Sequence, residues 1–458
     1  MKKRDLKPLS DAIYPVAGNG LLDRRLFLKT GLIFSTATVV SAALPALVGA
    51  ADKKPAAINP ASPPWMHEPG APFSIYGMPS PYEDTVVRFP TANRDVPGNG
   101  VSWTPLHKLE GMITPSGLHF ERHHNGVPQI DPVQHRLLIH GLVNNPSFFT
   151  MENLLRYPLQ SRICFVECGG NSNAGWNKSP AKAEAGYFHG LVSCSEWTGI
   201  PLSIILNECG VTKKAKWVIA EGADAFAMNI SIPLEKAMND TLLALFQNGE
   251  RIRPENGYPL RLIVPGWEGV LHVKWLRRLK LTDRPIMARN ETSKYTELQP
   301  SGRARMFTFV MEAKSLITSP SANMVLKQPG LYQITGLAWS GRGKITRVEV
   351  SADGGKSWAE AALQEPVLDK CFTRFRVPWK WDGKPAVLKS RATDVTGYVQ
   401  PERDKLIAER GRHGFFHYNA IVSWQVDENG LVNHTYDSKD ENEKTDGTGA
   451  INIDTGWD

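Results

Sequence analysis

The sequence predicts an α+β body followed by an all-β sandwich, and two observations indicate this division. Between about Leu106 and Asp283, short apolar runs alternate with short helical patterns, which is typical of a mixed domain. From about Pro320 to Val432 the helical patterns give way to strand-like runs separated by turn residues, which predicts a β-sandwich. A chain of 458 residues is also too long for one compact core, so at least two domains are expected.

The N-terminal region resembles an export leader of the twin-arginine type. Arg24 and Arg25 precede the apolar run 31–48, and small residues that suit a signal peptidase surround Gly49. A membrane anchor is the alternative, but the run is barely of spanning length and contains Thr, Ser and Pro. We therefore expect residues 1–50 to be a cleaved leader and the protein to be periplasmic. Because this route exports folded proteins, the leader also favours a cofactor inserted before export.

Three further segments flank or separate the two domains. Residues 51–105 are dense in Pro and Gly without periodicity, which predicts an extended arm with little regular structure. The polar stretch 284–318 is expected to be a linker that contributes to the active site, between a catalytic body at 106–283 and a sandwich at 319–432. The tail 433–458 is rich in Asp, Glu, Lys and Gly and is expected to be a mobile end or a strap on a neighbour.

Charge and cysteine usage exclude several classes of protein. The formal net charge is +7, and it falls by four without residues 1–50, which carry seven basic and three acidic residues. This small excess does not indicate a nucleic-acid partner, and no membrane partner is expected of the mature chain. The five cysteines form no CxxC pair, no haem-attachment motif and no zinc pattern, and their odd number argues against a complete disulfide framework. At least one thiol is therefore expected to be free, and a free thiol can bind a metal.

The central chemical signal is Cys168, which follows an apolar strand and precedes two glycines in the segment Phe165–Asn171. Glycines allow the backbone to approach a bulky ligand closely. Taken alone, such a cysteine is more often a small buried hydrophobic residue than a ligand. Basic segments upstream and downstream are flanked by Gly and Pro and suit a dianionic phosphate, although each by itself could be a surface salt bridge or a helix cap. These segments contain Arg122, His123, His124, Arg261, His272 and Lys274.

In this order and spacing, the segments resemble the sulfite oxidase family of molybdopterin enzymes from about Leu106 to Trp424. The resemblance implies a molybdenum–molybdopterin cofactor whose metal is bound by the thiolate of Cys168, with no haem in this chain. It assigns to Arg122 the stabilisation of charge on the oxidised sulfur, and to Tyr295 a hydrogen bond to an oxo group or a substrate oxygen. The cofactor contacts that it implies are His123, His124, Asn125, Gly126, Val127, Asp224, Asn256, Arg261, His272, Val273 and Lys274. The second domain resembles the immunoglobulin-like dimerisation domain of these enzymes.

Departures from the family pattern bear on the substrate. Members that oxidise free sulfite have arginine where this chain has Asn173 and tryptophan where it has Tyr187, and a late arginine aligns with Asn419. A pterin-contacting histidine is replaced by Asn256. Fewer cations weaken the capture of a small dianion, so the site is expected to accept sulfur that is carried on something larger.

The stretch that begins at Glu291 is similar to the molybdenum subunit of the sulfur dehydrogenase in bacterial thiosulfate-oxidising (Sox) systems. This implies oxidation of sulfane sulfur held on a carrier protein, and electron transfer to a separate c-type cytochrome. It also implies a homodimer through the C-terminal domain or a heterotetramer with the cytochrome.

Three alternatives are open. The first is a dehydrogenase that oxidises free sulfite to sulfate. The second is a reductase of methionine sulfoxide or nitrate, which is disfavoured because such members usually lack the immunoglobulin-like domain or match at other segments. A non-enzymatic adhesion or binding protein would leave Cys168 and its basic neighbours without a function.

Overall fold

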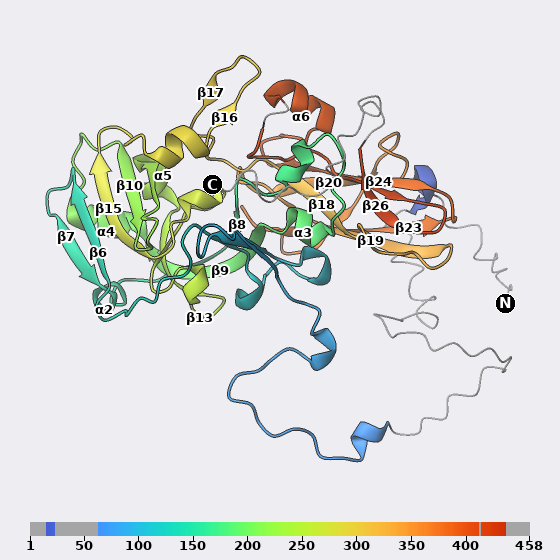
Figure 1. Cartoon of the computed structure of the whole chain (residues 1–458), viewed down its shortest axis with the longest axis horizontal. Helices are drawn as coiled ribbons and strands as arrows, with labels where there is room; N and C mark the ends of the chain where they lie inside the picture. The colour runs from blue at the N-terminus through green and yellow to red at the C-terminus, as the bar shows by residue number, and fades with distance from the viewer. Residues whose placement is uncertain (1–14, 23–62, 412–413, 437–458) are drawn as a thin grey trace, which may run out of the picture. The chain divides into compact units, whose positions relative to one another are not determined.

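The computed structural model describes residues 15–22, 63–411 and 414–436 (Figure 1). Most of the expected leader, including Arg24 and Arg25, and the tail beyond residue 436 lie outside these ranges. Contacts divide the chain into a small unit, 28–86, and a large unit that holds the remainder. In the small unit the described part contains two single-turn helices, Pro64–Met66 and Pro81–Glu83, and exposes most of its side chains.

The catalytic body contains two five-stranded sheets. The first, which we call the β15 sheet, has the order β11-β10-β15-β6-β7, and only β15 and β6 are parallel. Its strands are β6 (Arg136–Gly141), β7 (Ser147–Thr150), β10 (Trp217–Gly222), β11 (Asn229–Pro233) and β15 (Leu276–Thr282). The second, the β9 sheet, has the order β13-β12-β9-β8, with β14 also on β12. Its strands are β8 (Gln160–Glu167), β9 (Val192–Pro201), β12 (Leu242–Gln247), β13 (Glu250–Arg251) and β14 (Arg261–Ile263).

Short helices connect these strands. In α4 (Leu202–Cys209) the buried residues are Leu202, Ile205, Leu206 and Cys209, a spacing that places one apolar face against the core. The helix ends at Gly210, which adopts a positive φ of 68°. The other α-helices are α2 (Met151–Leu154), α3 (Ala185–His189), α5 (Leu234–Asn239) and α6 (Arg403–Arg410). Single helical turns lie at Gly18–Gly20, Leu106–Lys108, Ser116–Leu118, Asn173–Trp176, Pro254–Asn256, Gly269–Leu271 and Asn290–Lys294.

The C-terminal region is a sandwich of two sheets. One has the order β1-β2-β23-β19-β18, with β22 on β23, and the other has the order β21-β20-β24-β25-β26. The strands of the first are β1 (Pro15–Ala17), β2 (Leu21–Leu22), β18 (Lys314–Ser319), β19 (Gly330–Trp339), β22 (Ala362–Leu363) and β23 (Thr373–Trp381). Those of the second are β20 (Ile345–Ser351), β21 (Ala359–Glu360), β24 (Ala386–Asp394), β25 (Ser423–Val426) and β26 (Val432–Thr435). Trp339, Trp379 and Trp424 are completely buried in the sandwich.

The apolar core of the sandwich extends into the catalytic body, which also has apolar clusters of its own. The cluster that fills the sandwich also contains Phe165, Val192 and Cys194 from the β9 sheet. The backbone N–H of Phe165 donates to the carbonyl of Lys370 at 3.1 Å, which links β8 to the sandwich directly. In Figure 1, β8 and β9 accordingly lie between the β15 sheet and the sandwich. The strand that leads to Cys168 is therefore held from both sides.

The predicted fold class, an α+β body followed by an immunoglobulin-like sandwich, is confirmed, with β-structure predominating. Three segments are more ordered than the sequence indicated. Residues Phe89–Ala92 (β3) and Gly100–Trp103 (β4) form a sheet with Glu121–His123 (β5), although they fall in the expected arm. Lys314 to Thr318 belong to β18 rather than to a linker. The third segment is Pro15–Leu22, which pairs with the sandwich.

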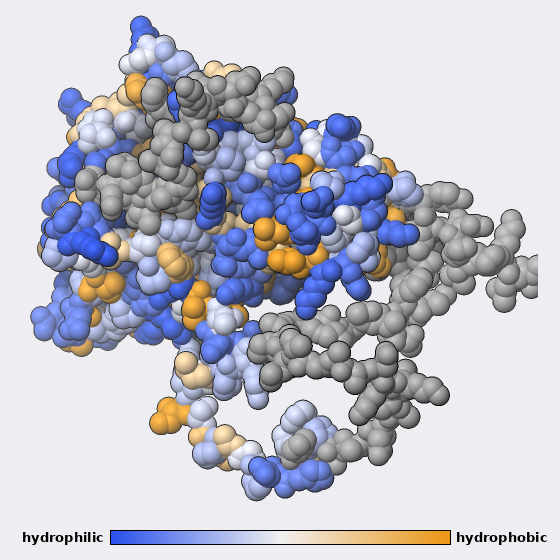
Figure 2. Space-filling model, turned by 45° about the vertical axis from the view of Figure 1, so that its right-hand side comes forward, coloured by the Kyte–Doolittle hydropathy of each residue, from blue (hydrophilic) through white to orange (hydrophobic). Residues whose placement is uncertain are grey.

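The polar stretch before β18 contains a short hairpin of β16 (Glu297–Leu298) and β17 (Ala304–Arg305). On the face shown in Figure 2, hydrophobic residues form small groups among hydrophilic ones. No helix in the described part of the chain is long and apolar enough to cross a membrane.

Candidate active site

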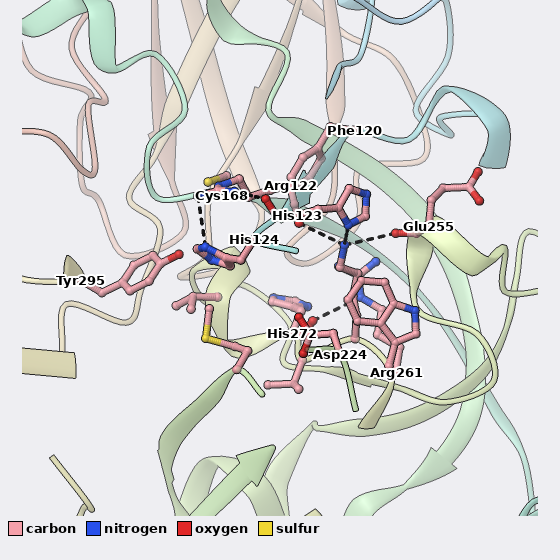
Figure 3. A pocket seen from close by; sticks show the side chains of 16 residues that line it. Phe120, Arg122, His123, His124, Cys168, Asp224, Glu255, Arg261, His272 and Tyr295 are labelled. Carbon is pink, nitrogen blue, oxygen red and sulfur yellow. Dashed lines mark hydrogen bonds between the residues drawn. The ribbon is translucent and has the colours of Figure 1, made fainter. Parts of the chain in front are cut away.

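Ten of the residues singled out in the sequence line one pocket of the catalytic body (Figure 3). The pocket lies where the ends of β5 and β8 meet the loops around β14 and β15, so the chain brings distant segments together. These residues are Arg122, His123, His124, Cys168, Asp224, Arg261, His272, Val273, Lys274 and Tyr295. The pocket also contains side chains that the motifs did not indicate, namely Phe120, Met228, Glu255, Val270 and Trp275.

Cys168 occupies one end of the pocket, in the turn that ends β8. Its backbone N–H donates to the carbonyl of Leu191 at 2.9 Å, and Asn171 N–H donates to the carbonyl of Cys168 at 2.9 Å. Burial raises the pKa of the Cys168 thiol to about 11, against the opposing effects of the Gly170 N–H and the Arg122 guanidinium. A bound cation would favour the thiolate, because a metal deprotonates a coordinating thiol. All five cysteines are free.

Arg122 and Tyr295 face the same end of the pocket (Figure 3). The guanidinium of Arg122 donates to Asn99 Oδ1 at 3.3 Å and to the carbonyl of His123, and its Nη2 lies 3.3 Å from His124 Nδ1. Burial lowers the pKa of Arg122. Burial also raises the pKa of the Tyr295 hydroxyl, so Tyr295 keeps its proton at neutral pH and can donate a hydrogen bond.

His123 joins this end of the pocket to Lys274. Lys274 Nζ donates to His123 Nδ1 at 2.9 Å, and His123 Nε2 then donates to Glu121 Oε2 at 2.6 Å, while Glu121 also pairs with Arg88. Burial, and then Lys274, lowers the pKa of His123 to about 4.

His124 is also neutral. Its ring stacks on Phe226 at 4.0 Å, and burial followed by Arg122 lowers its pKa to about 3. The positive charge in the pocket is therefore carried by arginine and lysine side chains and not by these two histidines.

The far end of the pocket holds two cations, the buried Arg261 and the half-buried Lys274. Arg261 donates only to the carbonyls of His272 and Asn256, and Lys274 to the carbonyls of Arg122 and Glu255 in addition to His123. Neither residue forms an ion pair with a carboxylate within the described ranges. Burial lowers the pKa of Arg261 to about 9 and that of Lys274 well below its usual value. Cations held away from water without a direct ion pair are costly, which favours a site for an anionic ligand.

The polar atoms around these cations fit a pterin with a phosphate group. Asp224 Oδ1 is buried in the pocket without a hydrogen-bond partner, and burial raises the pKa of this carboxyl. It is therefore available to accept from a ligand N–H. Gly257 has a φ of 117°, and a Cβ there would lie 3.1 Å from the Lys274 side chain. The residues present thus fit the group: Arg261 and Lys274 would hold the phosphate, Asp224 would accept from the pterin, and Cys168 would bind the metal.

His272 has a different environment. Val264 N–H donates to its Nδ1 at 3.3 Å and its Nε2 donates to the carbonyl of Trp267 at 3.1 Å, so both ring nitrogens bind backbone. Burial lowers the pKa of His272 to about 3. These bonds fix the loop between β14 and β15 at the pocket wall.

A buried polar network lies beneath the Cys168 turn and joins it to the sandwich. The carboxylate of Glu167 accepts from Lys314 Nζ at 3.2 Å, from Trp339 Nε1 at 2.6 Å and from Asn171 Nδ2 at 2.9 Å. Lys314 Nζ also donates to Ser172 Oγ at 2.6 Å. Lys314 and Trp339 belong to β18 and β19, so the sandwich helps to support the Cys168 turn.

A second charged cluster, which includes Arg410 and His417, supports the same turn. The backbone N–H of His417 donates to the carbonyl of Gly169 at 2.8 Å. The ring of His417 lies 3.5 Å from Glu268 and 3.6 Å from Glu312, and Arg410 pairs with Glu312 at 3.0 Å. Although burial lowers the pKa of His417, Glu268 and Glu312 raise it to about 10. A side chain at Gly169 would collide with Glu268, since a Cβ would lie 1.7 Å from Oε1.

The other singled-out residues do not line this pocket. Asn125 lines the adjoining cavity, Gly126 N–H donates to the carbonyl of Gly98 at 2.8 Å, and Val127 is 40% exposed. Asn256 is buried behind the wall and donates to the Ser116 carbonyl and to Gln247 Oε1. Among the positions that depart from the family pattern, Tyr187 packs against Phe89 and Trp103, and Asn419 donates to the Ala313 carbonyl and the Tyr398 hydroxyl.

A second cavity of about 390 Å³ opens beside Cys168 and has an aromatic wall. It shares Arg122, His124, Cys168 and Tyr295 with the first pocket. The Tyr295 ring stacks on Phe416 at 5.1 Å, and Phe416 packs against Phe415 at 4.8 Å. The sequence motifs did not indicate Phe226, Arg289, Lys294, Phe415 or Phe416, which also line this cavity.

Comparisons with known proteins agree with the fold and the pocket. Residues 124–290 match the family described as oxidoreductase molybdopterin binding domain, and residues 305–424 match the Mo-co oxidoreductase dimerisation domain. In the solved structure of the sulfane dehydrogenase SoxCD from Paracoccus pantotrophus, a chain is 46% identical to this one. The match covers 82% of this chain and 97% of that one, with a TM-score of 0.80.

Curated relatives match over a smaller share of their length. Mitochondrial sulfite oxidase of Mus musculus is 30% identical over 353 residues, which is 70% of this chain and 63% of the mouse enzyme. The NADH nitrate reductase of Solanum lycopersicum is 31% identical over 342 residues, which is 65% of this chain but only 37% of the plant enzyme.

The two family matches, together with the fold and the pocket, identify a molybdopterin-binding oxidoreductase, and the cofactor is molybdenum–molybdopterin. The chain belongs to the sulfite oxidase family.

Proposed function

We propose that this protein is a periplasmic sulfur dehydrogenase that oxidises carrier-bound sulfane sulfur and passes the electrons to a c-type cytochrome. The observation that carries the proposal is the cavity beside Cys168. Its wall includes Phe226, Phe415 and Phe416, and its volume of about 390 Å³ is large for a free sulfite ion. Arg289 and Lys294 also line it and would attract an anionic arm. The likeness to the sulfane dehydrogenase SoxCD supports the same substrate class.

The residues of the site would divide the chemistry between them. The molybdenum cofactor, when bound, supplies two-electron oxidation with transfer of an oxygen atom that originates from water. Arg122 would stabilise the negative charge that develops on the oxidised sulfur. The Tyr295 hydroxyl, which keeps its proton, would donate a hydrogen bond to a substrate oxygen. Phe226 and Phe416 would exclude water from the reacting sulfur.

The assembly follows from the same likeness. The C-terminal region matches a dimerisation domain, which supports a homodimer or a heterotetramer with the cytochrome. The absence of a haem-attachment motif from the sequence agrees with an acceptor on another subunit. Export of the chain to the periplasm rests on the leader-like sequence around Arg24 and Arg25.

The free-sulfite dehydrogenase is the second candidate, because the chain also resembles mouse sulfite oxidase and retains Arg122. The two are separated by metal analysis of the purified mature protein, followed by assays with sulfite and with carrier-bound sulfane sulfur, using cytochrome c as acceptor. We expect about one molybdenum per chain and a higher kcat/KM for the carrier-bound substrate. A higher kcat/KM for sulfite would favour the second candidate, and molybdenum-free protein from a molybdenum-replete host would exclude both.

The aromatic wall provides a direct test of the substrate. Phe415→Ala removes part of the cavity lining without changing a residue assigned to the cofactor. We expect kcat/KM for the carrier-bound substrate to fall about tenfold, because one aromatic contact is lost, while kcat/KM for sulfite changes less than about twofold. Phe148→Ala is the control, since Phe148 is 69% exposed on β7. Equal losses with both substrates would contradict an enlarged, carrier-binding mouth.

A further inference from the structure

The segment Pro15–Leu22 is built into the edge of the sandwich. Its two short strands pair with each other, Pro15 opposite Leu22 and Ala17 opposite Leu21, and Leu21 also pairs with Trp379 of β23. Leu21 is completely buried and belongs to the apolar cluster of the sandwich. In Figure 1 this dark-blue segment lies beside the sheets of the C-terminal domain. The segment therefore contributes to the core of a domain that begins some three hundred residues later in the chain.

Polar contacts fix the turn between the two strands. Gly18 N–H donates to Ser357 Oγ at 2.6 Å, Asn19 Nδ2 donates to the Ala352 carbonyl at 2.8 Å, and Trp379 Nε1 donates to the Asn19 carbonyl at 2.6 Å. Three bonds over two residues specify one position of the turn on the sandwich.

The two glycines of this turn are required by the fit. At Gly18, a Cβ would lie 2.1 Å from Asp353 Oδ2. At Gly20, which has a φ of 85°, a Cβ would lie 2.2 Å from the Lys380 carbonyl oxygen. The sequence Gly-Asn-Gly thus suits both the left-handed backbone and the close approach to the sandwich.

Pro15–Leu22 lies within the expected leader, so its contacts with the sandwich would have a role that those of a permanent strand would not have. Leu22 is separated from Arg24 by a single residue, and the segment lies upstream of the apolar run of the leader-like sequence. Cleavage after that run would remove β1 and β2 and leave Trp379 Nε1 without the Asn19 carbonyl. The contact therefore belongs to the precursor rather than to the mature enzyme.

We propose that the folded sandwich binds the leader of its own precursor through Pro15–Leu22, so that the leader docks only after the C-terminal domain has folded. Docking needs Ser357, Ala352 and Trp379 in their final positions, and these residues come together only in the completed sheets. In the sequence, the docked segment ends two positions before Arg24, so it directly precedes the arginine pair along the chain. This inference is independent of the substrate and rests on the leader proposed for residues 1–50.

The test is hydrogen exchange measured by mass spectrometry on the uncleaved precursor. We expect the amides of Gly18–Leu22 to exchange at least about tenfold more slowly than in a free peptide of the same sequence. Leu21→Asp should abolish this protection, because it would bury a charge in the sandwich core. Val16→Asp is the matched control and should retain it, since Val16 is 48% exposed on the same segment.

A variant in the sandwich distinguishes docking from local structure within the leader. Ser357→Ala removes the acceptor of the Gly18 N–H, so protection of Gly18 should fall, whereas the mature enzyme should lose only the hydrogen bond from Ser357 to Asp353 and keep its activity. Exchange in the wild-type precursor at the rate of the free peptide would overturn the proposal. N-terminal sequencing of the exported protein provides the other decisive result, because a mature enzyme that still carries Pro15–Leu22 would make the segment a permanent strand.

Discussion

The two ends of the active-site pocket bury charge in opposite ways. Around Arg261 and Lys274 the cations bond to carbonyls and form no ion pair within the described ranges, whereas beneath Cys168 Lys314 pairs directly with Glu167. An anionic ligand at the first end would supply the direct partner that these cations lack. The ion pair at the second end stabilises the turn that carries the Cys168 thiol. This difference in ion pairing distinguishes residues expected to bind a ligand from residues that support the fold, and it needs no sequence motif.

The largest expected effect is at the thiol itself. Cys168→Ser should lower bound molybdenum and kcat by more than about 100-fold, because changes to residues that only support a ligand already cost up to that factor. Cys164→Ser is the control, since Cys164 is a buried thiol in β8, four residues before Cys168, and lines neither cavity. Metal analysis of both variants decides, and a Cys168→Ser enzyme with normal molybdenum would remove the basis for the metal assignment.

A pair of lysine variants tests the difference between the two ends directly. In cofactor-free protein, Lys314→Met should lower the free energy of unfolding by about 3–5 kcal/mol, because it leaves Glu167 buried and unpaired. Lys274→Met should lower it by less than Lys314→Met does, since Lys274 bonds to two carbonyls and His123 and leaves no directly paired carboxylate behind within the described ranges. Cofactor content should show the reverse order, with the larger loss in Lys274→Met.

Denaturant unfolding of the apoproteins and pterin analysis of the loaded proteins provide these readouts. Glu167→Gln combined with Lys314→Met should recover part of the lost stability, because the unpaired charge is gone. Equal destabilisation by the two single variants would show that the two ends do not differ in this respect.

The pH dependence of stability should be the smallest effect, and the two ends should contribute opposite slopes. The pKa values of His123 and His124 are lowered to about 4 and about 3, so these residues destabilise the fold as the pH falls below 6.5. The pKa of His417 is raised to about 10, so its contribution is complete below pH 6.5 and is lost as the pH rises toward 10. Apoprotein stability should therefore be greatest near pH 6.5.

Unfolding free energies measured from pH 4 to pH 10 test this expectation. His417→Asn should flatten the alkaline side by an amount on the order of 3 kcal/mol and should also weaken the acid dependence that Glu312 contributes below pH 4.5, because His417 lowers the pKa of that carboxyl. An alkaline slope that is identical in the variant and the wild type would mean that the Glu268 and Glu312 pairs do not hold the proton on His417.

The residues that line the pocket were predicted better from the sequence than the residues that surround and stabilise it. Cys168, Arg122 and Lys274 stand in short segments whose residue types match a chemical task, and all three line one pocket. Lys314 was assigned to a polar linker, because a lysine in a sequence gives no sign that it will be buried beside Glu167. Phe415 and Phe416 gave no signal either, since their place in the cavity depends on contacts with Tyr295, which lies more than a hundred residues away. Periodicity predicts strands, but it does not predict which distant loop a strand will face.

The apolar cluster common to both domains has a consequence for how such enzymes can change over time. Because Phe165 and Cys194 pack into the same core as the sandwich tryptophans, and Lys314 anchors Glu167, the C-terminal domain cannot be exchanged or removed as an independent module. A shortened descendant would need a new cation and a new apolar surface beneath its catalytic thiol before it could lose the sandwich.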